Sequence, residues 1–198
     1  IAPVVPETAA LIGDRQVRNC GTMGGSVAHA DPGADYPTVL KALGATITAT
    51  GGNGEREIAA DDFFRGMFAT ALEPGELVTS VKVPATGAGT GAAYLKHAHP
   101  ASRYAVVGVA AVVTVENGSC VSARLTVGGL TAPPVDAAVE SLIGGPGSEE
   151  AIAAAAEKVP ASLPDTAGDT YASGEYRKHL ATVLAKRALR EAFERAVT

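Results

Sequence analysis

The longest apolar run in the chain, residues 105–115, constrains its fold more than any other feature. The run is far shorter than the roughly 20 consecutive apolar residues that a membrane-spanning helix needs. Residues 104–116 and 120–128 both have a strand-like pattern and are separated by a short turn, and residues 92–97 form a third such run. We therefore expect no membrane span, and we expect these three segments to form an antiparallel meander.

After Pro133 and Pro134 the pattern changes from strands to helices. We predict helices over residues 135–143, over 148–157 with Ser148 as the N-cap, and over 174–197, where apolar residues recur at spacings of three to five. Sheet and helices are therefore segregated in the second half of the chain, which is typical of an α+β fold.

The first half of the chain predicts shorter elements. Residues 21–34 contain three glycines before Pro32 and Gly33, and we interpret this stretch as a loop. The other predicted elements are helices over 6–12 and 35–43, a hairpin of 45–50 and 55–59, a helical turn over 61–64 and a strand over 76–83. Residues 85–91 are small and uncharged and favour a linker, so we expect two domains, residues 1–86 and 91–198.

Composition and charge narrow the possible functions. The 198 residues are 46% hydrophobic and 19% charged, a balance typical of a globular protein. Sixteen Lys and Arg residues against 21 Asp and Glu residues give a net charge of −5. No run of basic residues is dense enough to follow a nucleic-acid backbone. We therefore expect no nucleic-acid partner.

The two cysteines and the first residues bear on the cellular compartment. Cys20 and Cys120 lie far apart in the sequence, and neither belongs to a C-x-x-C pair. This pattern favours small buried thiols over a disulfide framework or a cysteine-based metal site. Residues 1–6 have none of the features of a signal or transit peptide. We therefore expect a cytoplasmic location.

The glycine-rich segment carries the clearest binding chemistry. Gly24 and Gly25 lack a Cβ, so successive backbone N–H groups there can approach an anion closely, and the hydroxyls of Thr22 and Ser26 add donors. Such a segment suits a phosphate or pyrophosphate, although glycine pairs also serve tight turns. Asp35 follows as an acceptor for ribose hydroxyls, and a helix-capping role suits it equally well.

The histidines raise the question of a metal site. His97 and His99 lie two residues apart on a predicted strand, so both can face the same side. A third and a fourth ligand are not evident, and we expect no metal site. His29 and Asp31 are expected to shape the glycine-rich segment.

Several ordered motifs resemble one known family, the FAD-binding medium subunits of molybdenum hydroxylases, which include xanthine dehydrogenase and aerobic carbon monoxide dehydrogenase. The resemblance runs over nearly the whole chain. The motifs are GDRQVRNCGTMGGSVAHADPGADYP (13–37), DDFFRG (61–66), ELVTSVKVP (76–84), YLKHAHPASRYAVVGVAA (94–111) and YASGEYRKHLATVLAKRAL (171–189).

The resemblance implies a fold in two parts. The first is the second lobe of a vanillyl-alcohol-oxidase-type FAD-binding domain, and the second is a small antiparallel sheet packed with a helical bundle, as in the carbon monoxide dehydrogenase flavoprotein C-terminal domain. The family has a further lobe with its own glycine-rich pyrophosphate loop before the helix expected at residues 6–12. Half of the pyrophosphate cradle is therefore expected outside this sequence.

The resemblance also implies a set of cofactor-binding residues. Thr22, Gly24, Gly25 and Ser26 match the family's second FAD motif, against the pyrophosphate, with Met23 where Ile or Leu is usual. Asp35 matches an acidic position on the nucleotide side, Val78 a backbone contact to the flavin ring, Lys96 a flavin-contacting lysine, and Tyr104 a tyrosine that covers one face of the isoalloxazine. Without the resemblance, Lys96 is most simply a solvated strand lysine and Tyr104 a half-buried strand aromatic.

The implied function is electron transfer. The resemblance implies that FAD receives electrons from the iron–sulfur clusters of a small partner subunit, in a complex with a molybdopterin large subunit, and passes them to an external acceptor. Such a role needs no catalytic acid or base, and Lys96 would stabilise negative charge on reduced flavin. The alternative is a cofactor-free module that docks partner subunits.

Overall fold

The first half of the chain is built around a three-stranded sheet. The computed structural model describes residues 2–198. A Gly-Asn turn folds β1 (Thr46–Gly51) and β2 (Gly54–Ala59) into the predicted hairpin, and β5 (Leu77–Lys82) pairs antiparallel with the other edge of β1. The remaining elements of this half are α1 (Val4–Leu11), α2 (Arg15–Cys20), α3 (Met23–His29), α4 (Asp35–Ala42), α5 (Ala60–Phe63), β3 (Phe64–Gly66) and β4 (Ala69–Thr70). The buried side chains of Val27, Leu40, Ile47 and Phe63 form its core.

The second half is the predicted meander with helices on one side. Its sheet has the order β6-β7-β8-β9, and all of its pairings are antiparallel. The strands are β6 (Thr90–Ala98), β7 (Ala105–Glu116), β8 (Ser119–Gly128) and β9 (Val135–Ala137). They are followed by the 3-10 helix η1 (Glu140–Leu142), α6 (Glu149–Ala156), α7 (Val159–Ser162) and α8 (Gly174–Ala196). The fold is therefore α+β with antiparallel sheets, as predicted.

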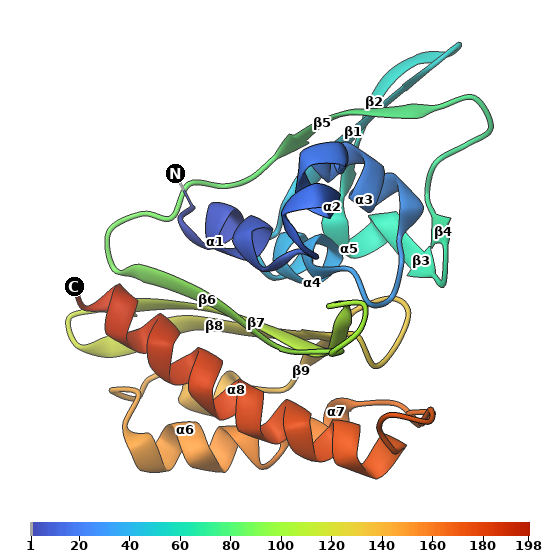
Figure 1. Cartoon of the computed structure of the whole chain (residues 1–198). Helices are drawn as coiled ribbons and strands as arrows, with labels where there is room; N and C mark the ends of the chain where they lie inside the picture. The colour runs from blue at the N-terminus through green and yellow to red at the C-terminus, as the bar shows by residue number, and fades with distance from the viewer. Residues whose placement is uncertain (1) are drawn as a thin grey trace.

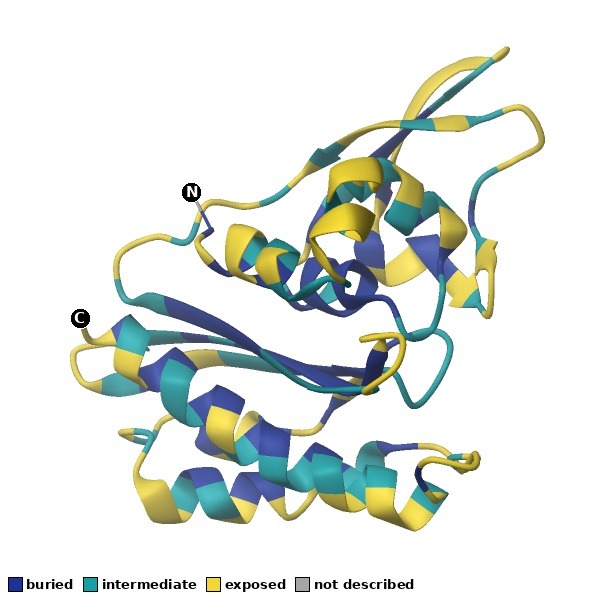
Figure 2. Ribbon diagram, in the orientation of Figure 1, coloured by how far each residue is buried: buried dark blue, intermediate teal, exposed yellow. Residues whose placement is uncertain are grey.

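The four-stranded sheet is a central layer covered on both faces. In Figure 1, α1 and α4 lie above it, and α8, α6 and α7 lie below it. Figure 2 shows buried residues along the middle of β7 and on the side of α8 that faces the sheet. A strand covered on both faces needs apolar side chains on both, so the apolar run at residues 105–115 shows no alternation with polar residues. Among the described residues, none of the helices has the length and apolarity required to cross a membrane.

Two of the predicted secondary-structure elements are wrong. The segment 21–34 is not a loop throughout, because it contains α3. Thr22 caps this helix, and the buried side chain of Val27 anchors it, so two glycines in its first turn do not prevent it from forming.

The predicted helix over 135–143 is also wrong. Its first residues extend as β9, which pairs with β8 from Leu125 to Val127, and only η1 is helical. Asp136 accepts hydrogen bonds from Thr126 (2.6 Å) and Arg124 (2.7 Å) across this pairing. These partners lie about ten residues upstream, outside the segment from which the helix was predicted, so the local pattern contains no information about the pairing.

Serine caps position the helices of the lower layer. The Ser148 side chain accepts a hydrogen bond from the Ala151 N–H at the start of α6, as predicted, and Ser173 does the same for Tyr176 at the start of α8. Helix α8 crosses β6 and β7, and its Ala192 carbonyl comes so close to β6 that a Cβ at Gly91 would overlap it. The strand-to-helix spacing therefore depends on glycine at this position.

This close approach predicts the effect of a single methyl group. We expect Gly91→Ala to lower the free energy of unfolding by about 1–3 kcal/mol or more, because α8 must move away from β6. Gly52→Ala is the matched control: a Cβ there meets nothing within 4 Å, and we expect a change within about 0.5 kcal/mol. Urea denaturation measures both. Equal midpoints for the two variants would contradict the packing.

Candidate functional site

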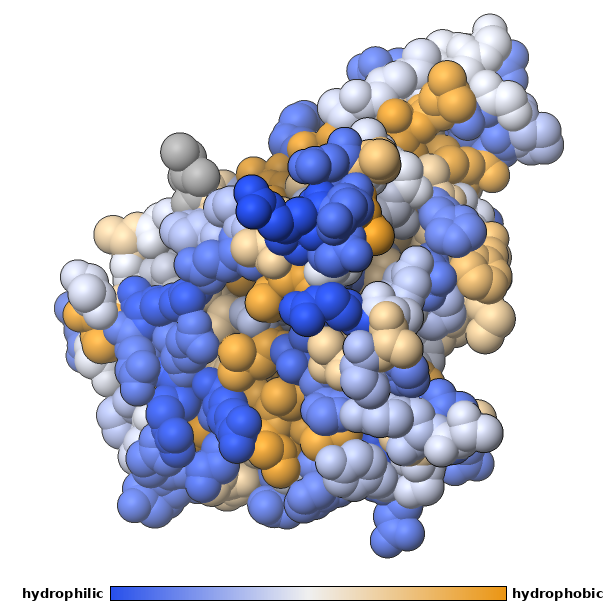
Figure 3. Space-filling model, in the orientation of Figure 1, coloured by the Kyte–Doolittle hydropathy of each residue, from blue (hydrophilic) through white to orange (hydrophobic). Residues whose placement is uncertain are grey.

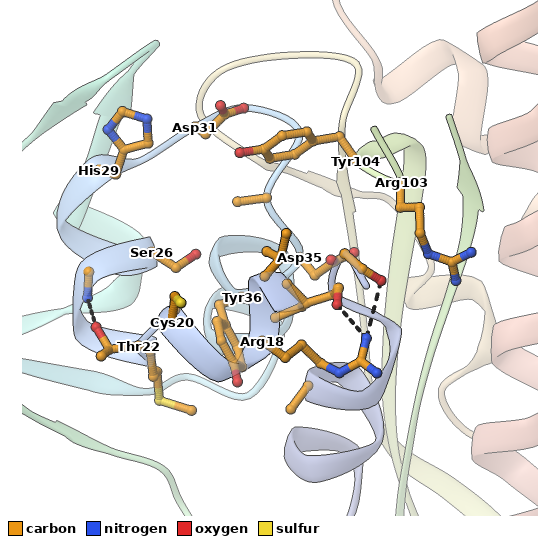
Figure 4. Close-up of a pocket in the computed structure, with 18 of the residues that line it drawn as sticks. Arg18, Cys20, Thr22, Ser26, His29, Asp31, Asp35, Tyr36, Arg103 and Tyr104 are labelled. Carbon is orange, nitrogen blue, oxygen red and sulfur yellow. Dashed lines mark hydrogen bonds between the residues drawn. The ribbon is translucent and has the colours of Figure 1, made fainter. Parts of the chain in front are cut away.

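A cavity of about 600 Å³ lies where the two halves of the chain meet. One wall comes from the end of α1 with α2 and α3, and the opposite wall is the loop before β7. Figure 4 shows Thr22, Ser26 and His29 along α3, with the Tyr104 ring extending toward Asp31 from the other side. Apolar side chains form a band down the middle of the face seen in Figure 3, below the hydrophilic region around α2.

Six of the nine predicted site residues line this cavity: Thr22, Met23, Gly25, Ser26, Asp35 and Tyr104. Gly24, Val78 and Lys96 are not among the lining residues, although all three lie close behind them. A Cβ at Gly24 would meet the Val78 Cγ1 and carbonyl oxygen at 3.9 Å, so β5 backs the glycine pair. The structure therefore gathers the predicted residues in one region of the fold.

The local geometry of the glycine-rich segment follows from its capping residue. Thr22 Oγ1 accepts a hydrogen bond from the Gly25 N–H at 2.9 Å, and the Ser26 N–H donates to the Thr22 carbonyl at 3.1 Å. A Cβ at Gly25 would lie only 2.9 Å from Thr22 Oγ1. Glycine at this position therefore lets the cap close and keeps the cavity wall free of side chain.

Asp35 is the buried charge of the site. Asp35 is 4% exposed, and its carboxylate accepts hydrogen bonds from the Tyr94 hydroxyl (2.6 Å to Oδ1) and the Lys96 ammonium (2.8 Å to Oδ2). Burial, followed by the nearby Asp35 charge, raises the pKa of Tyr94 well above its usual value. The same two causes raise the pKa of Tyr36. Both phenols are therefore protonated at neutral pH.

Lys96 is neither a solvated strand lysine nor part of the cavity wall. Its side chain is 3% exposed, and besides Asp35 it donates to the Arg103 carbonyl at 2.9 Å. This second bond ties β6 to the loop that carries Tyr104. Arg103 has a left-handed φ of 61°, a conformation that costs a non-glycine residue energy, so the loop needs such fixed contacts.

Tyr104 is 49% exposed and covers one end of the cavity. A Cβ at Gly33 would lie 3.2 Å from its ring, and the adjacent Ala105 N–H donates to the Gly33 carbonyl at 3.0 Å. Backbone contact between the two halves therefore sets the position of this aromatic ring.

The structure adds residues that the sequence patterns did not single out. Arg18 lines the cavity and donates from Nη1 to the carbonyls of Ile12 (2.8 Å) and Gly13 (3.1 Å), which closes the C-terminus of α1 (Figure 4). Arg103, Ser102 and Tyr36 also line it. Apart from the charge of Arg18 in a polar stretch, no sequence pattern indicates these roles.

The cysteines and histidines are placed as follows. Cys120 is buried as predicted, but the prediction is wrong for Cys20, which is exposed at the end of α2, a helix with no buried residue. His97 and His99 both contact the Tyr171 ring, and His97 Nε2 lies 3.0 Å from the Tyr171 hydroxyl. Within residues 2–198, no group of three or more His, Cys, Asp or Glu side chains could hold a metal ion.

Comparison with known proteins gives two family matches. Residues 1–86 match the model described as FAD binding domain in molybdopterin dehydrogenase. Residues 92–192 match the model of the CO dehydrogenase flavoprotein C-terminal domain.

Similar chains of known function and structure cover nearly all of this sequence. The carbon monoxide dehydrogenase medium chain of Afipia carboxidovorans is 37% identical over 98% of this chain and 68% of its own length. The 6-hydroxypseudooxynicotine dehydrogenase complex subunit alpha of Paenarthrobacter nicotinovorans is 40% identical over 98% of this chain and 66% of its own. The structure of quinoline 2-oxidoreductase from Pseudomonas putida 86 aligns with a TM-score of 0.90 at 32% identity, over 99% of this chain and 68% of that one. The chain thus spans about two thirds of the length of these relatives.

The contrast between the two cysteines is testable. We expect iodoacetamide to modify Cys20 in the native chain, because its side chain is exposed at the cavity, and to spare Cys120, because burial shields that thiol and raises its pKa. Peptide mass spectrometry before and after denaturation measures both sites, with Cys20→Ser as the control. Equal labelling of the two thiols in the native state would contradict the structure.

Proposed function

The chain belongs to the family of FAD-binding medium subunits of carbon monoxide dehydrogenase and related molybdenum hydroxylases, and on that premise we propose that it passes electrons through FAD within a multisubunit complex. The electrons come from the iron–sulfur clusters of a small subunit, beside a molybdopterin large subunit, and go to an external acceptor. The observation that carries this proposal is the cavity between the glycine-rich segment and the Tyr104 loop.

The residues around the cavity fit FAD. The cavity volume of about 600 Å³ is in the usual range for ligand sites, about 300–1,000 Å³. Gly25 leaves the wall open for close approach of a pyrophosphate, and Thr22 and Ser26 supply hydroxyls. Tyr104 offers an aromatic face that a flat ring system can contact, and Arg18 and Arg103 are cations at the wall.

Each predicted residue has a role in this proposal. Residues 22–26 hold the pyrophosphate, and Asp35 lies on the nucleotide side. The Val78 backbone contacts the flavin ring, with β5 behind Gly24, while Tyr104 covers one ring face. Lys96 contributes its positive charge from behind Asp35 and the Arg103 carbonyl.

The chemistry is divided between cofactor and protein. FAD, when bound, supplies the redox capacity, and this chain needs no catalytic acid or base. The protein orients the cofactor, shields it from water on the Tyr104 side and fixes the charges around it. The two free cysteines fit a reducing compartment such as the cytoplasm.

The division of the chain at residues 86–91 is part of the proposal. Residues 1–86 act as the second lobe of the FAD-binding domain, and residues 91–198 act as the C-terminal domain that supplies Lys96 and Tyr104. We propose that a preceding lobe with a second glycine-rich loop holds the rest of the pyrophosphate, as the family pattern implies.

Loss of FAD from a glycine variant tests the proposal. In the full-length subunit we expect Gly25→Val to abolish FAD retention, because its side chain displaces the Thr22 cap and enters the cavity. Gly52→Val, in the open β1–β2 turn, is the matched control and should retain FAD. Flavin absorbance of the purified protein and quenching of added FAD fluorescence give the measurement.

The two candidate functions predict different results. A wild-type subunit that assembles with its partners but holds no flavin would favour the cofactor-free docking module. Unchanged flavin content in Gly25→Val would remove the glycine-rich segment from the site.

A further inference from the structure

Tyr94 and Lys96 form a paired contact to one buried carboxylate. Both side chains project from the same face of β6, because they lie two residues apart on a strand. Tyr94 donates to one oxygen of Asp35 and Lys96 to the other, at 2.6 and 2.8 Å. A neutral hydroxyl and a charged ammonium therefore together stabilise the negative charge of one carboxylate.

The fold makes specific room for the Tyr94 hydroxyl. Gly108 on β7 is the neighbour of Lys96 in the strand pairing, and a Cβ there would overlap the Tyr94 hydroxyl. Tyr94 is only 6% exposed, so water has little access to its bond with Asp35. Any change in this hydrogen bond therefore acts directly on the carboxylate.

We infer that Tyr94 is a positioning residue of the flavin site: its hydrogen bond sets how much negative charge Asp35 presents to the cavity. This inference rests on the proposed function. Asp35 lines the cavity and Tyr94 does not, so Tyr94 acts through Asp35 and makes no contact of its own with the cavity.

Electrostatics gives the direction of the effect. Lys96 alone compensates only one oxygen, and it divides its donors between Asp35 and the Arg103 carbonyl. Without the Tyr94 hydroxyl, the second oxygen keeps more of its charge in a region of low dielectric constant. Asp35 is bonded to Lys96, the lysine that the proposed function assigns to the flavin, so charge left on the carboxylate offsets the positive charge that Lys96 contributes toward reduced flavin. The midpoint potential of FAD should therefore fall.

The test uses Tyr94→Phe in the assembled complex, with Thr126→Val as the matched control. Thr126 is also buried and donates its hydroxyl to a carboxylate, Asp136, at 2.6 Å, but neither residue lines the cavity. Each variant loses one hydroxyl donor from the same sheet. We expect both to retain FAD and lose similar thermal stability. Only Tyr94→Phe should shift the midpoint potential of FAD to more negative values, by an amount equal to about a threefold change in the reduction equilibrium.

A second variant keeps the hydroxyl and strengthens the bond. Site-specific 3-fluorotyrosine at position 94 is a more acidic phenol and a stronger donor, so it should shift the potential in the positive direction. A purely structural role does not predict shifts of opposite sign. This variant also decides the matter if Tyr94→Phe fails to fold or loses its FAD.

The outcomes separate the two claims. Wild-type protein without FAD would overturn the proposed function. Wild-type protein with FAD, but with the same potential in Tyr94→Phe, the fluorotyrosine variant and Thr126→Val, would overturn the role of Tyr94 alone. Opposite shifts in the first two, with none in the third, would establish it.

Discussion

The buried carboxylate of Asp35 is the interaction on which the junction of the two halves depends. A charge removed from water needs partners close by, and both of its partners, Tyr94 and Lys96, come from the other half of the chain. Helix α4 begins at Asp35, so this helix cannot shift along β6 without leaving a buried charge unpaired. The other contacts of the cavity are built on this fixed placement.

Glycines on the central sheet determine how closely its two covering layers approach. A Cβ at Gly128 would overlap the Thr38 side chain of α4, and one at Gly91 would overlap the backbone of α8. Helices therefore approach both faces of the sheet at positions where it carries no side chain. The apolar character of β7 and these glycines have a common cause. A sheet between two helical layers must be apolar on both faces, and it must lack side chains where a helix approaches most closely.

Local patterns were sufficient for the elements that pack by simple periodicity. They also singled out Thr22, Gly25, Ser26 and Asp35 of the cavity wall, whereas Met23 and Tyr104 came from the family resemblance. The β1–β2 hairpin, the meander and α8 each follow from alternation, turn residues or helical spacing within one segment. Helix α3 and strand β9 do not, because a side-chain cap and pairing with β8 override the local propensity. The family resemblance supplied Lys96 as a site residue, but its position behind the wall depends on Asp35, which lies 61 residues away in the sequence.

The balance of charge at the cavity wall therefore depends on contacts between the two halves, because neither half supplies both the carboxylate and its donors. The carboxylate comes from α4, and the ammonium and hydroxyl that compensate it come from β6. The same ammonium holds the Arg103 carbonyl, and this bond fixes the loop that carries Tyr104. Movement of β6 relative to α4 would change the charge of the wall and the position of the aromatic ring together. The electrostatic environment of a bound ligand and its contact with the aromatic ring therefore both depend on how the two halves are packed together.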